Sequence, residues 1–369
     1  MPCLNYNDLF PGSMYCGEQG GTPGNTSNWT GIGLTGVFVN TNSVAVGNSA
    51  RAEGVNTTAI GTNTLVLGND ATAVGFQSEA SEGSSTAIGA GARATGSNSS
   101  AFGANSLASG PNSVASGSSA AATGNASSAY GRLSIANNAG ASAYGERSTA
   151  SGIGASAFGS QATASGASSV AIGASARAQN AGGIAIGGNA NAVSTNSIAI
   201  GNGAVAQSSV ALGGGAQATG LNATAVGDNA IASGNTSVAL GNAAQAAAAN
   251  SVALGNGSVA NQANTVSVGS TGNERRIANV ADGVDDTDAV TVGQMNAALA
   301  ALGGANPALQ QQIDNLQVDM TNLRREALAG VALAMAMSSP FFLERGKTSF
   351  NVGVGTYGAS RRWPLVWVG

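Results

Sequence analysis

The sequence predicts a mostly-β fold: a parallel β-roll (a solenoid), followed by a neck, an α-helical coiled coil and an incomplete β-barrel anchor. The first observation behind this is a short phrase, apolar–small–apolar–Gly, which recurs at a fixed interval, as in Val44-Ala45-Val46-Gly47 and Ile198-Ala199-Ile200-Gly201. The second is a heptad pattern of apolar residues from residue 295. A fixed short period is typical of solenoids, and heptads are typical of coiled coils.

The phrase repeats every 14 residues, except for one 12-residue step between Gly201 and Gly213. A second phrase, Ala-x-Ala-x-Gly, lies between successive copies, as in Ala92-Arg93-Ala94-Thr95-Gly96. Glycine recurs every few residues, and each glycine inside a helix would cost about 1 kcal/mol relative to alanine. The alternation within each phrase has the period of a strand. Each repeat therefore predicts two short strands joined by Gly, Asn and Ser turns, and stacked repeats predict parallel ladders.

The alternation also predicts which side chains face inward. We expect the two large residues of the first phrase, such as Val44 and Val46, to oppose two alanines of the second phrase across a thin interior. The third position becomes aromatic at Phe102, Tyr130, Tyr144 and Phe158, which predicts a locally thicker core. The middle residue of the second phrase should point outward, in a file with about 4.8 Å between rungs. This file comprises Arg93, Leu107, Ala121, Ile135, Thr149, Thr163, Arg177, Asn191, Val205, Gln217, Ile231, Gln245 and Val259.

Composition excludes several classes of function. The 369 residues include 56 glycines and no histidine, and only 8% are charged. Histidine is the commonest general base and metal ligand, so we expect no enzyme, no metal site and no cofactor. The chain has a net charge of −4 and its sequence contains no basic stripe, which argues against nucleic-acid binding. Residues 1–40 are expected to be irregular and show no secretory signal, and we assign no function to Cys3 or Cys16.

The β-roll is expected over residues 41–270 and a neck over 271–294. The neck is rich in charge, and we expect its arginines to pair with its carboxylates within or between chains. Four aspartates lie close together here, but they lack the ligand spacing of a calcium loop. The residues singled out are Arg275, Arg276, Asp282, Asp286 and Asp288.

A coiled-coil stalk is expected over residues 295–328. Two sets of residues alternate at spacings of four and three, which is the pattern of a coiled-coil seam. Gly303-Gly304 and Pro307 should loosen the first half of the helix, yet the register continues in phase beyond them. The predicted seam comprises Leu299, Leu302, Leu309, Ile313, Leu316, Met320 and Leu323.

Residues 329–369 predict part of a membrane anchor. Gly330 to Met337 is apolar with small residues but too short to cross a bilayer alone, which takes about 20 apolar residues. Lys347 to Tyr357 alternates as a barrel strand does. The residues that follow do not alternate, and Arg361-Arg362 and Pro364 stand where a lipid-facing strand should continue. We therefore expect this anchor to be truncated, and we expect the last residues to be encoded out of frame.

The order of repeats, neck, coil and anchor resembles the trimeric autotransporter adhesins, the YadA-like family of Gram-negative outer-membrane proteins. Asn196 to Gly201 and Asn250 to Gly255 resemble the family's head repeat, and Arg275 to Gly283 resembles its neck. The resemblance implies a homotrimer with left-handed parallel β-roll heads on the cell surface, held by an outer-membrane anchor. Family anchors give four strands per chain, of which only one is recognisable here.

The predicted function is non-enzymatic adhesion to host extracellular matrix or cells. The resemblance links the Asn-Ser-Val-Ala-Ile-Gly repeat to collagen, and the matching positions suggest a ligand-binding role for Asn42, Ser43, Asn196, Ser197, Asn250 and Ser251. The same residues are also what each rung needs in order to fold. Two alternatives remain open: a trimeric phage or cell-surface fibre with a structural role, and a truncated adhesin without function.

Overall fold

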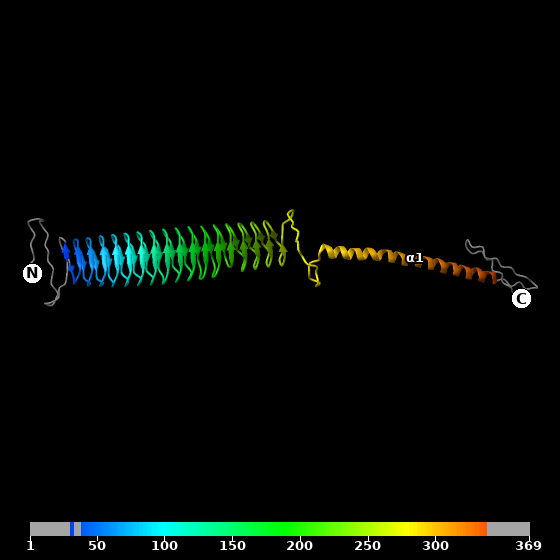
Figure 1. Cartoon of the computed structure of the whole chain (residues 1–369), viewed down its shortest axis with the longest axis horizontal. Coiled ribbons are helices and arrows are strands. Elements are labelled where there is room, and N and C mark those ends of the chain that lie inside the picture. The colour runs from blue at the N-terminus through cyan, green and yellow to red at the C-terminus, as the bar shows by residue number, and fades with distance from the viewer. Residues whose placement is uncertain (1–29, 33–37, 338–369) are drawn as a thin grey trace, which may run out of the picture. The chain divides into compact units, whose positions relative to one another are not determined.

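The structure, a computed structural model, describes residues 30–32 and 38–337. The chain divides after Arg275 into two compact units, which we describe separately. The first unit is the predicted parallel β-solenoid, of which Figure 1 shows the stacked rungs. Strands alternate along the chain between two parallel sheets, so that each turn of the solenoid contributes one strand to each sheet.

The odd-numbered strands form one sheet: β1 (Thr30–Ile32), β3 (Val44–Val46), β5 (Thr58–Ile60), β7 (Thr72–Val74), β9 (Thr86–Ile88), β11 (Ser100–Phe102), β13 (Val114–Ser116), β15 (Ser128–Tyr130), β17 (Ser142–Tyr144), β19 (Ser156–Phe158), β21 (Val170–Ile172), β23 (Ile184–Ile186), β25 (Ile198–Ile200), β27 (Val210–Leu212), β29 (Thr224–Val226), β31 (Val238–Leu240), β33 (Val252–Leu254) and β35 (Val266–Ser267).

The even-numbered strands form the other sheet: β2 (Phe38–Val39), β4 (Arg51–Ala52), β6 (Leu65–Val66), β8 (Glu79–Ala80), β10 (Arg93–Ala94), β12 (Leu107–Ala108), β14 (Ala121–Ala122), β16 (Ile135–Ala136), β18 (Thr149–Ala150), β20 (Thr163–Ala164), β22 (Arg177–Ala178), β24 (Asn191–Ala192), β26 (Val205–Ala206), β28 (Gln217–Ala218), β30 (Ile231–Ala232), β32 (Gln245–Ala246) and β34 (Val259–Ala260).

Every strand pairs in parallel with the strand of the next rung at the same position of the repeat. Val44 pairs with Thr58 and Ala45 with Ala59, and on the other sheet Arg93 pairs with Leu107. Equivalent side chains therefore stack in continuous files along the solenoid, separated by the strand spacing of about 4.8 Å.

The interior is built from alanine, and this corrects the predicted phase of the first phrase. Ala45 is fully buried, whereas its neighbours Val44 and Val46 are only partly buried and face outward. The alanines of the second phrase, such as Ala92 and Ala94, are buried as expected. Short turns hold the two sheets so close together that nearly all inward side chains are Ala or Ser, with Val66 among the few larger ones. The period of two was right, but the large residues lie outside.

Buried hydroxyls fill the remaining inward positions. Ser134 Oγ donates to the Gly131 carbonyl at 2.9 Å, and Ser148 Oγ donates to the Gly145 carbonyl at 2.9 Å. These bonds satisfy a hydroxyl that would otherwise be costly to bury. Each also ties a core residue to the turn before it, at a position that alanine occupies in other rungs.

The closing glycine of the first phrase is required by both conformation and space. Gly145 has φ +134°, and a Cβ at this position would lie 2.5 Å from the Gly159 carbonyl oxygen of the next rung. A side chain cannot occupy that place. The glycine period read from the sequence therefore marks a turn at which one rung approaches the next too closely for a side chain.

The 12-residue step is absorbed in one turn without loss of register. Ile198 pairs with Val210 and Val205 pairs with Gln217, so both sheets continue. Ser208 stands in the shortened turn, where its Oγ donates to the Gly220 carbonyl at 3.0 Å and accepts from the Asn222 amide at 3.1 Å.

The solenoid begins before residue 41, within the segment we expected to be irregular. Thr30 pairs with Val44, and Gly31 takes the place opposite Ala45. The sequence Thr30-Gly31-Ile32-Gly33 is a copy of the first phrase with glycine for alanine, 14 residues before the next copy. That substitution hid it from the predicted repeat.

The second unit contains the neck and one helix, α1 (Val292–Met337), 46 residues long. Its start is a capping box: Gln294 N–H donates to Thr291 Oγ1 at 3.1 Å, and Thr291 N–H donates to Gln294 Oε1 at 3.2 Å. The helix continues through Gly303-Gly304 and Pro307, and it extends beyond both ends of the expected stalk. Among residues 30–32 and 38–337, no helix is long and apolar enough to span a membrane. The predicted anchor strand lies outside the described residues.

Candidate functional site

The head presents two outward faces with different chemistry. We call the first the odd-strand face: the outward first and third residues of the strands in the odd-numbered sheet. We call the second the even-strand face: the outward first residues of the strands in the even-numbered sheet. The core between them contains no titratable side chain among its buried members. Any binding by the head must therefore use these two faces or the turns that join them.

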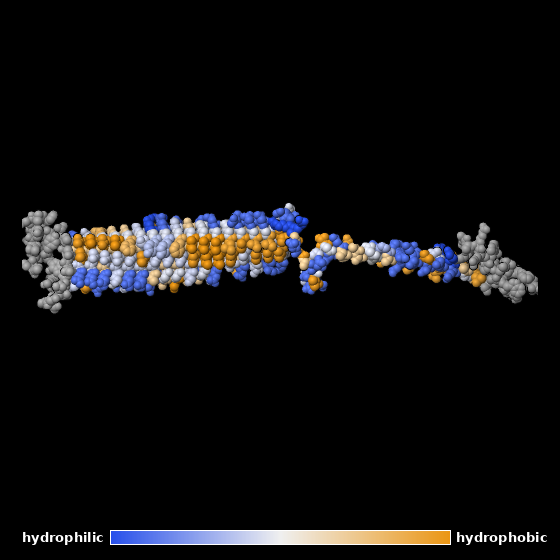
Figure 2. Space-filling view, viewed as in Figure 1, coloured by the Kyte–Doolittle hydropathy of each residue, from blue (hydrophilic) through white to orange (hydrophobic). Residues whose placement is uncertain are grey.

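The odd-strand face carries large apolar side chains that the single chain leaves exposed. Ile88 is 41% exposed and Leu240 is 43% exposed, and their register partners along the file are mostly Val, Ile or Leu. Figure 2 shows an apolar band along the head, with a paler stretch within it. Contiguous exposed apolar surface of this kind marks an interaction site.

The four aromatic residues lie on the odd-strand face, not in a thickened core, which corrects our expectation. Phe102, Tyr130, Tyr144 and Phe158 are each 37–38% exposed. Tyr130 and Tyr144 stack with ring centroids 4.8 Å apart, and Tyr144 and Phe158 stack at 4.9 Å, both with rings 9° from parallel. They follow the outward phase of the third position, which the sequence analysis had assigned inward.

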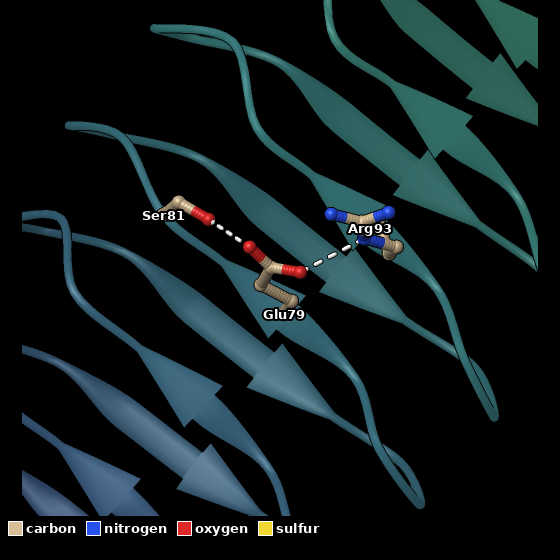
Figure 3. Close-up of polar contacts among 3 residues, drawn as sticks. All are labelled: Glu79, Ser81 and Arg93. Carbon is tan, nitrogen blue, oxygen red and sulfur yellow. Dashed lines mark hydrogen bonds and ion pairs between the residues drawn. The ribbon is translucent and has the colours of Figure 1, made fainter.

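The even-strand face is polar and mixed, and the predicted outward file is confirmed there: Arg93 and Gln217 are exposed while the alanines beside them are buried. Its best-formed polar contact joins two rungs (Figure 3). Arg93 Nε donates to Glu79 Oε2 at 2.8 Å, and Ser81 Oγ donates to Glu79 Oε1 at 2.5 Å. Partial burial by itself would raise the pKa of Glu79, but Ser81 and Arg93 together hold that pKa below its ordinary value.

The predicted ligand-binding pairs divide between core and surface. Ser43, Ser197 and Ser251 are fully buried, and Ser251 Oγ, for example, donates to the Ala248 carbonyl at 2.7 Å. A ligand has no access to these hydroxyls. Asn42, Asn196 and Asn250 are exposed, and each has a positive φ of 53° to 58°, a conformation in which asparagine is enriched.

The asparagines also bond to the next rung. Asn250 Nδ2 donates to Asn264 Oδ1 at 2.9 Å, and Asn42 Nδ2 donates to Asn56 Oδ1 at 3.2 Å. These contacts give the asparagines a role in folding whether or not they touch a ligand. Of the six predicted residues, only the three asparagines are placed where a partner can reach them.

Arg275 closes the last rung of the head. Its Nη1 donates to Ser258 Oγ at 2.8 Å and to the Val268 carbonyl at 2.6 Å, and its Nη2 donates to the Asn256 carbonyl. We expected it to pair with neck carboxylates, but its guanidinium is occupied by acceptors of the head. A guanidinium presents several donors in a fixed plane, which suits the free carbonyls where the ladder ends. Arg276 is exposed.

The neck carboxylates order the chain before α1. Asp288 Oδ2 accepts from the Val284 and Asp285 amides at 3.0 and 3.1 Å, and these bonds hold the pKa of Asp288 below its ordinary value. Asp282 Oδ1 accepts from Thr291 Oγ1 at 2.6 Å, while Asp286 is exposed.

Gln294 was missed as a neck residue. Its side chain exchanges two hydrogen bonds with the backbone of Gly283, both 2.9 Å long. The Thr-x-x-Gln pattern at 291–294 is a recognised helix start and was the available signal. Gln294 thus both caps α1 and holds the chain of the neck beside the start of the helix.

The predicted seam is fully exposed on the single helix. Exposure runs from 48% at Ile313 to 69% at Leu302, so no other described part of the chain covers these residues. The seven seam residues lie on α1 in the heptad spacing predicted, and they leave the helix with an uncovered apolar stripe in which only the seam position between Leu302 and Leu309 is polar, at Asn306. Such a stripe requires at least one partner helix.

Two further features of the described residues concern metal binding and cavities. No group of three or more Cys, Asp or Glu side chains in residues 30–32 and 38–337 is arranged to hold a metal ion. A depression of about 440 Å³ opens beside the last rung, lined by residues that include Val259, Val266, Glu274 and Arg275. It lies where the final rung has no successor, and Arg275 and its acceptor residue Val268 form part of its lining.

Comparison with known proteins places most of the chain. The family described as "YadA head domain repeat (2 copies)" matches repeatedly between residues 40 and 271, and "Coiled stalk of trimeric autotransporter adhesin" matches residues 276–318. A solved structure, the collagen-binding domain of the Yersinia adhesin YadA, is 23% identical, with 68% of this chain and 87% of that chain covered and a TM-score of 0.21. At that score the superposition itself adds nothing to the comparison of folds.

Proposed function

Because the chain belongs to the YadA-like trimeric autotransporter adhesins, we propose that it is a non-enzymatic surface adhesin of a Gram-negative bacterium, acting as a homotrimer. Its β-roll head would bind host extracellular matrix or host cells. The stalk and an outer-membrane anchor would hold the head at the cell surface. The observation that carries this proposal is the pair of uncovered apolar surfaces, one on the odd-strand face and one along α1.

Both surfaces need other copies of the chain. The odd-strand face leaves residues such as Ile172 about two-fifths exposed over many successive rungs. Burying apolar surface contributes about 25 cal/mol per Å², so covering a face of this length outweighs the cost of ordering its side chains. The seam of α1 has the same need, and a parallel trimer satisfies head and stalk with one assembly.

With the odd-strand faces turned toward one another, the even-strand face and the turns stay outside. There a matrix protein meets turns that recur at successive rungs, while the outward side chains of the even-strand face vary from rung to rung. We propose that the exposed asparagines Asn42, Asn196 and Asn250 contribute to binding a triple-helical partner such as collagen, as the head repeat suggests. Each contact would be weak, and affinity would arise from many rungs on three copies acting together.

The test is binding of the full chain to triple-helical collagen peptide immobilised on a sensor surface, with heat-denatured peptide as control. We expect binding to the triple helix that is lost when the trimer is dissociated. A stable trimer that binds neither collagen nor other matrix proteins would favour the alternative of a structural fibre. A chain that sediments as a monomer would overturn the assembly itself.

The asparagine contribution has its own matched test. Asn250→Gly keeps the positive φ, because glycine adopts it freely, and removes only the side chain. The control is Asn98→Gly, an exposed asparagine with φ 55° outside the predicted sites, which loses an equivalent hydrogen bond to Asn112 in the next rung. Equal binding by both variants would assign the asparagines to folding alone.

A further inference from the structure

We propose that one part of the odd-strand face fixes the register in which identical copies of this chain pack together. This part, which we call the aromatic segment, consists of the outward residues of the odd-numbered strands between residues 100 and 158. The inference rests on the homotrimer of the proposed function and goes beyond it. It assigns this part of the face to contact with the same rungs of another copy, not merely with any copy at any height.

The aromatic segment is the irregular part of an otherwise repetitive face. Its third positions read Phe102, Ser116, Tyr130, Tyr144 and Phe158, adjacent by parallel pairing. Elsewhere in the file the third position is Val, Ile or Leu. The paler stretch of the apolar band in Figure 2 reflects this change of residue type.

Within the segment, the two outward residues of a strand compensate each other in size. Wherever the third position is aromatic the first is serine, as in Ser142–Tyr144, and where the third position is Ser116 the first is Val114. A face open to solvent has no reason to balance its side chains in this way. Balance is expected when a second surface lies against the strands at a constant distance, because close packing tolerates neither overlap nor voids.

Outside the segment, little distinguishes one height from another. A copy displaced by one rung would place Val, Ile or Leu against Val, Ile or Leu again. The parallel stalk does not exclude a displacement of two rungs either. Two rungs measure about 9.6 Å, and one heptad of helix measures about 10.5 Å, so a slip of both parts together is nearly commensurate.

The aromatic segment makes that slip unfavourable. A two-rung displacement places Phe102 opposite Tyr130 and Tyr130 opposite Phe158, and it places Ser116 opposite Tyr144, so that a serine meets a ring where like residues meet in register. In register, each ring layer faces its own equivalent, and the stacked rings of Tyr130, Tyr144 and Phe158, 4.8 and 4.9 Å apart, form one continuous raised block. Ser116 separates this block from Phe102 and makes the pattern asymmetric along the head, so only one height fits.

The experiment measures register by cross-linking in the full chain. Native cysteines are removed by Cys3→Ser and Cys16→Ser, and Asn306→Leu removes a polar seam residue that can mark stalk register. Two tagged forms are co-expressed, one with Leu240→Cys and the other with Leu212→Cys, two rungs apart in the same file. A short thiol cross-linker joins 240 to 240 in register and 212 to 240 after a two-rung slip.

The levelled variant replaces all five third-position residues of the segment with leucine, the residue found at 240 and 254 in the same file. We expect the parent to give mainly same-rung products, with the slipped product at a low and measurable background. We expect the levelled variant to raise the slipped product at least fivefold. The matched control, Ile172→Leu, Ile186→Leu and Ile200→Leu, changes the same file outside the segment and should leave the parent pattern unchanged.

A levelled variant that stays trimeric and gives no more slipped product than the parent would overturn the register inference while leaving the adhesin proposal intact. Trimers without any same-rung product would show that this face does not meet its equivalent, and would overturn it as well. A monomeric parent would instead sink the proposed function. If the levelled variant does not fold, Tyr130→Leu with Tyr144→Leu repeats the measurement, with at least a twofold rise expected in the slipped product.

Discussion

The odd-strand and even-strand faces of the head share one alanine core and one rung spacing, yet their outward residues differ in kind. The odd-strand face repeats Val, Ile, Leu, Thr and Ser, with aromatic residues over rungs 100–158, and carries no ionised side chain on its strands. The even-strand face mixes Arg, Glu, Gln, Asn and Thr with apolar residues, and it holds ion pairs such as Arg93–Glu79.

The difference shows which properties folding imposes and which it leaves open. Folding of one chain demands small inward residues and glycine at the closing turn, and both faces obey this equally. It demands nothing of the outward positions beyond strand formation. Contact with a surface outside the chain therefore accounts for the persistent apolar character of one face. Contact with solvent and ligands accounts for the polar mixture of the other.

A matched pair of charge substitutions should show the largest difference between the two faces, in their effect on trimer association. Leu240→Asp places a carboxylate on the odd-strand face, and burying an unpaired charge in an interface costs several kcal/mol. Ile231→Asp places the same group on the even-strand face, where water solvates it. We expect sedimentation to show dissociation or strong weakening of the trimer for the first variant and none for the second. Equal behaviour of the two would mean that the odd-strand face does not mediate assembly.

The stalk seam offers the next largest effect. Ile313→Asp with Leu316→Asp puts two charges per chain into the seam, and we expect circular dichroism to lose helical signal while β signal persists, because rungs contact mainly their neighbours. The head should remain associated through the odd-strand face. The control, Gln311→Asp with Asn315→Asp, adds the same charge away from the seam. Loss of β signal in parallel with helix would contradict independent parts.

Much of this architecture was predictable because steric rules repeat in every rung. The glycine period gave the turns, the alanine doublets gave the even-strand interior, and the heptads gave α1. The phase of the first phrase was mistaken because large residues were assumed to be buried. The better signal was Ala45 and its equivalents, which stay alanine in successive repeats while Val44 and Val46 vary to Thr, Ser, Ile, Leu, Phe and Tyr.

The candidate site was less predictable. The exposed position of Asn42, Asn196 and Asn250 follows from turn geometry, but the burial of the adjoining serines depends on the inward phase that was misassigned. The closure by Arg275 could not be read from sequence, since it depends on carbonyls left free where the last rung ends. Those acceptors belong to Asn256 and Val268, which lie 19 and 7 residues before Arg275 along the chain.

Arg275 lies where the odd-numbered and even-numbered sheets end together, so its substitution should affect both faces of the head at that end. Its guanidinium bonds reach the last rung of each sheet, and hydrogen bonds to a charged group contribute about 1.5–3 kcal/mol. Arg275→Lys keeps the charge but not the planar donors, so we expect faster amide exchange over residues 252–269 and no change in the middle of the head. Arg276→Lys, on an exposed neighbour, is the control. Unchanged exchange in both variants would remove Arg275 from the closure.

The smallest expected effect is the pH dependence of the Glu79–Arg93 contact on the even-strand face. The pKa of Glu79 is lower in the folded head than its ordinary value, about 4.3 for glutamate. The contact therefore stabilises the head above that ordinary value, and its contribution disappears as pH falls through the depressed folded pKa. Because the pair lies at the surface, we expect about 0.2–1 kcal/mol at neutral pH.

The measurement that checks this is the difference in thermal midpoint between the parent and Glu79→Gln as a function of pH. The difference should be present at pH 7, shrink as the pH falls below the ordinary glutamate pKa of about 4.3, and vanish once the carboxyl of Glu79 is protonated in the folded head. Glu82→Gln removes the same charge from an exposed turn three residues away and should give a smaller difference at pH 7. If the two variants behave alike at every pH, net charge alone accounts for the effect. The contact between Glu79 and Arg93 then contributes nothing measurable to the stability of the head.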